Sequence, residues 1–231
     1  MTETLEQVEE AGRERLYPSI TNPNWLVLRK RRELFRRWLR DALPKNPLIL
    51  DVGGRIQPYR ALLPQESSYF AVDLRPTPLV NCIAVAQQLP FPNDLFDLVL
   101  CTQMLEYAPE PACVISEIHR ILKRGGVLLL SLPSVFPRDA DEDRWRFLPR
   151  AIRELLSDFA AVEVTPEGSS IAGFFRAVTI CCHVFAKYAV VRTAVSYTLI
   201  PVFNVAGWML EESIRSSNDV FAANYSVRAL K

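Results

Sequence analysis

The sequence predicts an α/β fold built on a doubly wound, mostly parallel sheet of seven strands, with an apolar helical insertion before the last strand. Two observations predict it. Short apolar runs with the length of buried strands alternate with segments whose apolar residues recur at helical spacing. The first run, residues 48–50, leads into Asp51, Gly53 and Gly54. Strand, glycine turn and helix in this order are typical of parallel sheets that bind nucleotide-like ligands.

The composition is that of one globular α/β domain with additions. The chain has 231 residues, of which 49% are hydrophobic and 23% charged. Its formal net charge is +1, so no global positive field indicates nucleic acid as a partner. Five cysteines without a CxxC pair favour a reducing, cytoplasmic compartment, and the acidic first 14 residues predict no signal peptide. His119 and His183 are far apart in the sequence, so we expect no metal site built on histidine.

Residues 1–46 predict an N-terminal arm followed by a basic helix. Residues 1–22 have no clear periodicity, and we expect a loose arm there. Asn24 is a candidate cap for a helix that ends near Leu43. Apolar residues share one face of this helix, which Arg31 interrupts, and basic residues share the opposite face. The basic face indicates either a solvated surface or contact with phosphates or an anionic membrane.

Residues 47–168 contain most of the predicted sheet and its ligand-binding edge. After the first strand we expect five more strands, over residues 69–73, 79–84, 96–101, 127–132 and 161–164. Helices are expected between them, over residues 58–63, 111–123 (ended by Gly125-Gly126) and 149–159.

Two acids follow strands of this predicted sheet. Asp51 ends the first strand, and Asp73 ends the second strand 22 residues later. In a parallel sheet both would lie at the edge where ligands bind, and Asp73 would accept hydrogen bonds from ribose hydroxyls or else cap the following bend. Gly53 and Gly54 lack the third glycine of dinucleotide sites. A carboxylate before them suits a ligand with an ammonium group, such as S-adenosylmethionine.

Residues 169–222 form a mostly apolar segment before the last strand, which we expect within residues 223–231. The stretch Thr193–Leu210 carries no charge over 18 residues, near the lower limit for a membrane span. Pro201 and Asn204 interrupt it and the last strand must return to the sheet, so we disfavour a span. Two alternatives stay open: a helical insertion that covers the substrate pocket or an oligomer interface, and a helical pair resting in one membrane leaflet.

Several short motifs occur in a recognisable order, namely Ile49-Leu50-Asp51-Val52-Gly53-Gly54, Val72-Asp73, Leu89-Pro90-Phe91, Phe96-Asp97-Leu98-Val99, Leu105-Glu106-Tyr107 and Leu122-Lys123-Arg124-Gly125-Gly126. From about Leu48 to Val164 the chain resembles the class I S-adenosylmethionine-dependent methyltransferases, most of all the branch called methyltransferase type 11. Residues 143–149 look like a segment that follows the fifth strand in bacterial members. The resemblance implies a Rossmann-like methyltransferase fold, S-adenosylmethionine as cofactor and methyl transfer as activity.

The resemblance also implies a cofactor-binding set. It assigns the methionine end of the cofactor to Asp51, Gly53 and Gly54, the ribose to Asp73, the surroundings of the adenine to Ala86 and Leu89, and the methionyl side to Thr102 and Gln103. Ordinary loop packing is the alternative for the last four. The sequence identifies no catalytic residue and no metal ligand. Glu106, Tyr107 and Asp143 are candidates for contacting the acceptor.

Three positions depart from the family pattern. Arg55 stands where the family usually has glycine, Val85 where aspartate often binds the adenine amino group, and Tyr107 where histidine is common. Because of these departures, a non-catalytic binding or scaffold protein is the alternative to a methyltransferase. A nicotinamide oxidoreductase is the third hypothesis. As a methyltransferase, the protein would act on a small-molecule or lipid-linked acceptor. We expect it in the cytoplasm, with peripheral contact at the inner face of the membrane if the apolar segment rests there.

Overall fold

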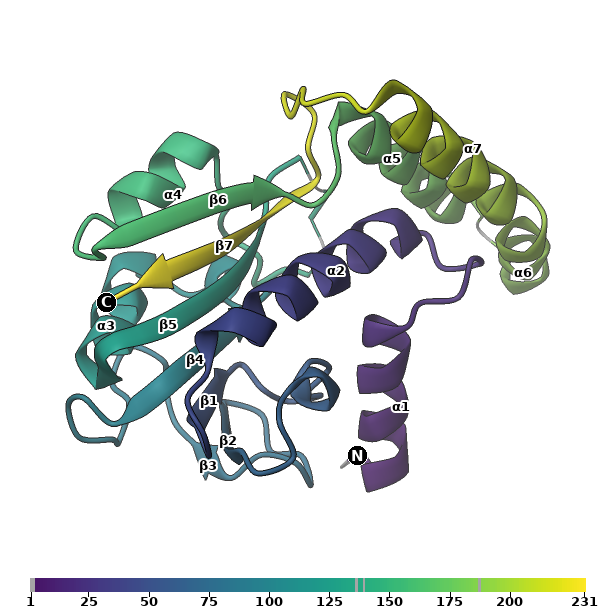
Figure 1. Cartoon of the computed structure of the whole chain (residues 1–231). Coiled ribbons are helices and arrows are strands. Elements are labelled where there is room, and N and C mark those ends of the chain that lie inside the picture. Colours follow the sequence, from purple (N-terminus) through teal and green to yellow (C-terminus); the bar gives the residue numbers. More distant parts are fainter. Residues whose placement is uncertain (1–2, 136, 139, 187) are drawn as a thin grey trace.

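A seven-stranded sheet in the order β3-β2-β1-β4-β5-β7-β6 forms the centre of the molecule in a computed structural model that describes residues 3–135, 137–138, 140–186 and 188–231 (Figure 1). The first five strands pair in parallel, and β7 lies antiparallel between β5 and β6. This arrangement confirms the predicted fold class. The strands are β1 (Leu48–Val52), β2 (Ser68–Asp73), β3 (Cys82–Ile83), β4 (Phe96–Thr102), β5 (Leu122–Pro133), β6 (Ala161–Pro166) and β7 (Asn224–Leu230).

Helices cover both faces of the sheet, as a doubly wound fold requires. One core cluster joins side chains of β1, β4 and β5 to the second helix and the first 3₁₀ turn, and the other joins the opposite sheet face to the third and fourth helices. The helices are α1 (Leu5–Leu16), α2 (Trp25–Ala42), α3 (Pro111–Ile121), α4 (Pro149–Leu155), α5 (Ser170–Phe185), α6 (Ala189–Tyr197) and α7 (Leu199–Ile214), with 3₁₀ turns η1 (Arg60–Leu62) and η2 (Leu105–Tyr107).

The central strands are buried on both faces, which explains their unbroken apolar runs. In β1, Ile49 packs in the cluster beneath α2, while Leu50 and Val52 pack in the cluster beneath α3. The strand therefore holds Asp51 at a fixed place at its carboxyl end, at the edge where parallel sheets bind ligands.

The prediction of a loose arm over residues 1–22 was wrong, because residues 5–16 form α1. Thr4 caps this helix and exchanges hydrogen bonds with Gln7, which is a capping box. The helix buries Val8, Gly12 and Leu16 at a spacing of four. A Cβ on Gly12 would run into the carbonyl oxygen of Ile56. Glycine therefore lets α1 lie directly on the segment that follows the glycine turn.

Other element boundaries also differ from the prediction. Gly125 and Gly126 lie inside β5 and do not end α3, because the chain turns extended at Leu122 and the Gly125 amide donates to the Lys231 carbonyl at 2.8 Å. The third strand has only two residues, because a turn in which the Val80 amide donates to the Thr77 carbonyl occupies its expected start. The helix expected over residues 58–63 is the short turn η1, and α4 ends at Leu155.

The apolar segment forms three helices at one end of the molecule, where α5 and α7 run side by side beyond the N-terminal end of α2 (Figure 1). The run Ala189–Ile214, which contains α6 and α7, is long and apolar enough to cross a membrane, and only 11% of its most apolar window is buried. Asn204 nevertheless ties α7 to the protein, since its amide nitrogen donates to the Ile20 and Asn22 carbonyls at 2.7 and 3.0 Å.

Candidate functional site

The Asp51 carboxyl group lies buried at the carboxyl end of β1, with 2% of the residue exposed. The Tyr69 hydroxyl donates a hydrogen bond to its Oδ2 atom at 2.5 Å. Within the described parts of the chain, Asp51 takes part in no ion pair. Burial raises the pKa of Asp51 to about 7, because the hydrogen bond from Tyr69 only partly offsets desolvation and the nearby charge of Asp73 adds to it.

A glycine turn closes over this carboxyl group. Gly53 has a φ of 82°, which favours glycine, and a Cβ on Gly54 would lie 2.8 Å from Asp51 Cγ. The amides of Gly53 and Gly54 both donate to the Val72 carbonyl, at 2.8 and 3.2 Å. These bonds tie the turn to the end of β2, so that Asp51 and Asp73 share one edge of the sheet.

Asp73 performs the capping role that the sequence left open. Its Oδ1 accepts a hydrogen bond from the Arg75 amide at 2.8 Å. No hydrogen bond to its Oδ2 occurs in the segments that the structure describes. The capping role therefore leaves one oxygen for a ribose hydroxyl.

The remaining predicted cofactor residues lie after β3 and β4. Ala86 is half-buried and Val85 is exposed, whereas Leu89 is a core residue. The Leu89 amide donates to Glu117 at 2.9 Å, so the loop after β3 is held on α3. Thr102 is half-buried at the end of β4, beside the end of β1.

Gln103 continues from β4 with a positive φ of 51°. Its amide donates to the Ser131 carbonyl at 2.9 Å, and its side-chain nitrogen donates to the Ser131 hydroxyl at 3.2 Å. Next to it, the Met104 side chain lies over Gly53, with Cγ 2.7 Å from where a Cβ of residue 53 would be. The loop after β4 therefore adjoins the glycine turn.

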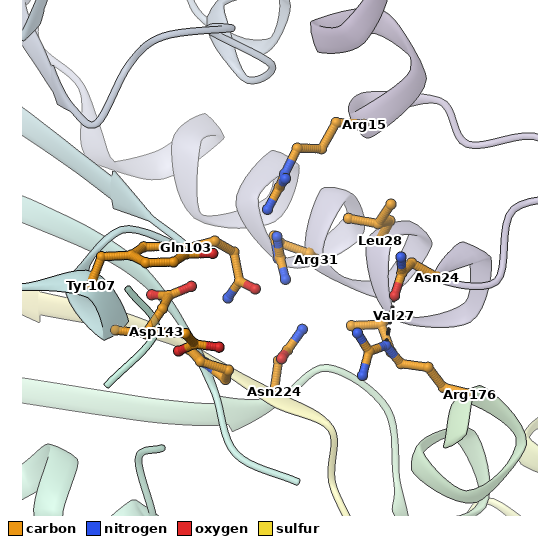
Figure 2. Close-up of a pocket in the computed structure, with 12 residues that line it drawn as sticks. Arg15, Asn24, Val27, Leu28, Arg31, Gln103, Tyr107, Asp143, Arg176 and Asn224 are labelled. Carbon is orange, nitrogen blue, oxygen red and sulfur yellow. Dashed lines mark hydrogen bonds between the residues drawn. The ribbon is translucent and has the colours of Figure 1, made fainter. Parts of the chain in front are cut away.

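A cavity of about 150 Å³ lies between this loop, α1, α2, α5 and the start of β7 (Figure 2). Gln103 is the member of the predicted cofactor set that lines it. Glu106, Tyr107 and Asp143, the candidates for contacting the acceptor, all line it as well. The Arg144 amide donates to the Glu106 carbonyl at 2.9 Å, which fixes residues 143–149 beside the cavity.

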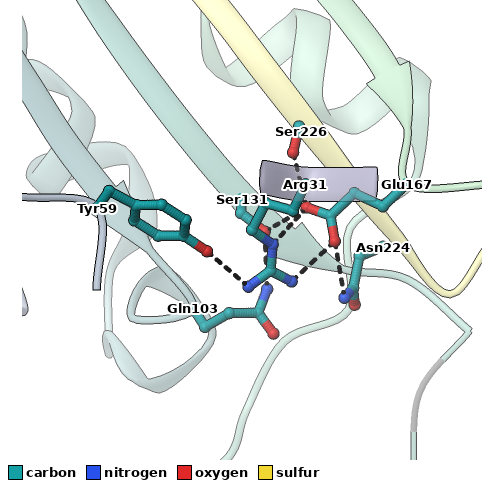
Figure 3. A network of polar contacts seen from close by, with 7 residues as sticks. All are labelled: Arg31, Tyr59, Gln103, Ser131, Glu167, Asn224 and Ser226. Carbon is teal, nitrogen blue, oxygen red and sulfur yellow. Dashed lines mark hydrogen bonds and ion pairs between the residues drawn. The ribbon is translucent and has the colours of Figure 1, made fainter. Parts of the chain in front are cut away.

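Arg31 forms part of the cavity wall through a buried network (Figure 3). Its Nε and Nη2 atoms donate to the two carboxylate oxygens of Glu167 at 2.7 and 2.8 Å. Glu167 also accepts hydrogen bonds from Ser131 and Ser226, at 2.6 and 2.7 Å, and from Asn224 at 3.2 Å. Burial opposes its charge, but Arg31 and these hydrogen bonds outweigh burial and lower the pKa of Glu167. This ion pair explains why an arginine interrupts the apolar face of α2.

Glu106 is buried in η2, and its Oε2 atom has no hydrogen-bond partner among the described residues. Burial raises the pKa of Glu106 to about 7, although a backbone hydrogen bond and the charges of Arg15 and Arg31 oppose the rise. A carboxyl group that titrates near neutral pH can accept a proton from a substrate hydroxyl.

Arg15 projects from α1 into the same cavity, toward Arg31 (Figure 2). Burial lowers the pKa of Arg15, and the charge of Arg31 lowers it further. Sequence reasoning missed Arg15 because it lies in the expected arm, although Thr4 and Gln7 at capping-box spacing were a signal for the helix. It also missed Arg176, Glu167 and Asn224, whose role at the cavity depends on contacts distant in sequence.

The residues at the sheet edge fit S-adenosylmethionine. The cofactor carries an ammonium and a sulfonium, and Asp51 is a buried carboxylate that lacks a cationic partner in the described chain. The glycine turn leaves this edge open to a ligand that side chains would otherwise exclude. In the described residues, no group of three or more histidine, cysteine, aspartate or glutamate side chains could hold a metal ion.

Comparison with known proteins indicates the methyltransferases, as the sequence motifs do. Residues 50–130 match the family model of the methyltransferase domain. The ubiquinone biosynthesis O-methyltransferase of Pseudomonas paraeruginosa is 41% identical over 71 residues, which are 31% of this chain and 28% of that protein. The chain therefore spans less than a third of the length of that relative.

Two solved structures share the fold. Phosphoethanolamine N-methyltransferase 2 of Haemonchus contortus, solved with phosphomonomethylethanolamine and S-adenosylhomocysteine, has a TM-score of 0.56 at 15% identity and covers 95% of this chain and 60% of its own. The [4+2]-cyclase SpnF has a TM-score of 0.53 at 18% identity and covers 100% of this chain and 97% of its own. At these identities the likeness shows the fold alone.

Proposed function

We propose that this chain, which belongs over its sheet core to the class I S-adenosylmethionine-dependent methyltransferases, transfers a methyl group from S-adenosylmethionine to an acceptor bound in the cavity beside the sheet. The observation that carries the proposal is the buried Asp51 carboxylate under the glycine turn. A buried charge without a partner is costly. The ammonium group of the cofactor would supply that partner.

The cavity supports a position for the acceptor next to the cofactor. Gln103 lines the cavity, and its neighbour Met104 lies over Gly53 in the glycine turn. When bound, S-adenosylmethionine supplies an electrophilic methyl group. The walls of the cavity would orient the acceptor and exclude water, which can provide most of the rate acceleration. Where the attacking group is a hydroxyl, Glu106 would take its proton.

The apolar helices support a hydrophobic or lipid-linked acceptor. α6 and α7 expose large apolar side chains, among them Val190, Tyr197, Val202 and Met209. α5 packs along α7 and also contributes Arg176 to the cavity wall. The relative from Pseudomonas paraeruginosa is named a ubiquinone biosynthesis O-methyltransferase. We therefore infer a cytoplasmic protein that contacts the inner face of the membrane through α6 and α7.

Calorimetry with S-adenosylmethionine and with NAD tests the cofactor assignment. We expect S-adenosylmethionine to bind and NAD not to bind. Asp73→Ala should weaken binding of S-adenosylmethionine by about 1–3 kcal/mol, because a buried hydrogen bond to ribose is lost. Arg75→Ala is the matched control, since it keeps the backbone amide that Asp73 caps. Binding of NAD alone would reject the proposal in favour of an oxidoreductase.

Washing vesicle pellets tests the membrane contact. A surface-bound helix pair should release from anionic vesicles at high salt or alkaline pH, because screening weakens the charge contribution. A spanning helix would stay until detergent is added, and a purely packed insertion would never pellet. Val202→Glu should reduce pelleting. Leu148→Glu, at an exposed apolar residue outside the insertion, should not.

A non-catalytic binding protein is the second candidate, favoured by Arg55 and Val85, which depart from the family pattern. SpnF, which has a similar fold, is named a [4+2]-cyclase and not a methyltransferase. Transfer of labelled methyl from S-adenosylmethionine into a membrane lipid extract separates the two. Label should enter the lipid fraction with the wild-type protein. Tight cofactor binding without transfer to any fraction of a whole-cell extract would favour the scaffold.

A further inference from the structure

We propose that the acceptor carries an anionic group, a carboxylate or a phosphate, which Arg15 binds, together with a hydroxyl or amino group that donates a hydrogen bond to Glu106 or Asn224. This inference rests on the proposed methyl transfer and names the class of acceptor for it. Three features of the cavity carry it, judged within the described residues: a cation without a hydrogen bond or ion pair, two buried hydrogen-bond acceptors without partners, and the size of the cavity.

Arg15 is a cation that a ligand in the cavity can reach. Arg176, which also lines the cavity, donates a hydrogen bond to the Asn24 side chain at 2.9 Å. The charge of Arg31 is compensated by Glu167, which holds it with two short hydrogen bonds. Asp143 is paired with Arg146 at 2.6 Å, so its negative charge is compensated as well. Arg15 takes part in no hydrogen bond or ion pair within the described ranges, and it lies partly buried beside the like charge of Arg31. An anion in the cavity would relieve this repulsion.

Two buried acceptor atoms in the cavity wall lack partners in the described part of the chain, Glu106 Oε2 and Asn224 Oδ1. The orientation of Asn224 follows from its neighbour: the Glu167 carboxylate only accepts hydrogen bonds, so the Asn224 nitrogen must face it. The Asn224 oxygen is therefore left for another donor. Buried polar atoms are normally paired, so both oxygens indicate a ligand that donates hydrogens.

The anion belongs to the acceptor and not to the methionine carboxylate of the cofactor. Asp51, Gly53, Gly54 and Asp73 do not line the cavity. The charges that act on Arg15 come from Arg31, Tyr59, Glu106 and Glu167, and the charge that acts on Asp51 comes from Asp73. Arg15 therefore faces the cavity, whereas Asp51 lies outside its wall.

The cavity fits a single ring or a group of similar size. Its volume of about 150 Å³ equals that of an engineered protein cavity that binds benzene. Arg15 from α1, Glu106 from η2 and Asn224 from β7 approach it from three elements. The chemistry that matches these groups is an acceptor head group with the substituents of a hydroxy or amino acid, or of its phosphate counterpart, with the acidic and the donating groups on opposite sides of a small body.

Calorimetry with three ring-sized probes tests the proposal: 4-hydroxybenzoate, 4-hydroxyphenyl phosphate and phenol, each with S-adenosylhomocysteine at saturation. Wild-type protein should bind one or both anions about tenfold to a hundredfold more tightly than phenol, and the tighter anion identifies the group. Arg15→Gln should remove this preference and leave phenol unchanged. Arg13→Gln, at an exposed arginine on the same helix, is the matched control.

Three outcomes are distinguishable. Equal binding of phenol and both anions, or an unchanged preference in a folded Arg15→Gln variant, overturns the proposal. Weaker binding of S-adenosylmethionine to Arg15→Gln, by the same factor as the anions, also overturns it and assigns Arg15 to the cofactor. Failure of the wild-type protein to bind S-adenosylmethionine at all rejects the proposed function itself. Arg15→Lys keeps the charge and should retain part of the preference, which controls for misfolding of Arg15→Gln.

Discussion

The sheet edge and the helices added to it differ in what they contribute. The edge presents Asp51, the glycine turn and Asp73, which lie in the stretch that matches the methyltransferase domain. The additions, α1, α2 and α5, present arginines to the cavity. We therefore propose that the core binds the cofactor, while the added helices select the acceptor.

The largest expected effect on stability comes from the ion pair that joins the two regions. Arg31→Leu should lower the free energy of unfolding by about 3–5 kcal/mol, because it leaves the Glu167 charge buried without its cation. The double variant Arg31→Leu with Glu167→Leu should recover much of this loss. Denaturant titration of the three proteins measures both effects. If the single variant loses less than about 1 kcal/mol, α2 is not held to the core by this pair.

A smaller effect is expected at the sheet edge, where Asp51→Asn removes a charge but keeps an acceptor for Tyr69. S-adenosylmethionine should bind about 1.5–3 kcal/mol more weakly, since a charge-assisted contact is lost. Wild-type affinity should also rise from about pH 6 to about pH 7.5 as Asp51, with its pKa near 7, becomes charged. The variant should lose this rise, while binding of anions in the cavity stays unchanged. A pH profile equal to that of the wild type would show that Asp51 does not contact the ammonium group.

Sequence patterns predicted the sheet edge and not the cavity, for a physical reason. A buried strand is recognised from consecutive apolar residues. The strand that ends at Asp51 and the glycines could therefore be predicted from neighbouring residues alone. The cavity depends on pairs that no local pattern contains: Arg31 and Glu167 are 136 residues apart. The sequence shows that Arg31 interrupts an apolar helix face, but it does not show that Glu167 is its partner. The sequence did not predict α1, because one of its buried positions is Gly12, which has no hydrophobic side chain to mark the helical spacing.

At the cavity, Glu106→Gln should change how the free energy of unfolding depends on pH. The pKa of Glu106 is about 7 in the folded chain against 4.5 ordinarily, so between these values the folded state holds a proton that the unfolded state lacks. The unfolding free energy of the wild-type protein therefore falls as pH rises through this window. Above about pH 7.5 the variant should be more stable by about 1–3 kcal/mol, and its pH slope should be shallower. Denaturant titration at several pH values measures this.

Turnover provides a second measurement on Glu106. With a hydroxyl acceptor, Glu106→Gln should lower kcat by about 10²–10⁴, because proton removal loses its base. Asp143→Asn, at another cavity acid, is a useful comparison, since Asp143 is held by Arg146 and is not expected to take the proton. Equal losses in both variants would assign the base role to neither residue.

The smallest effect is expected at Val85, on the exposed loop after β3. The family often has aspartate at this position, and the valine side chain offers no acceptor for the adenine amino group. Val85→Asp should therefore tighten S-adenosylmethionine binding by about 0.5–1.5 kcal/mol, the usual worth of one hydrogen bond. Because Val85 is exposed, the fold should tolerate the change, and thermal melting provides that control. Ile83→Asp, also exposed, should not tighten binding. A loss of affinity in a folded Val85→Asp protein would mean that valine packs against the cofactor, and that the sheet edge also differs from the family.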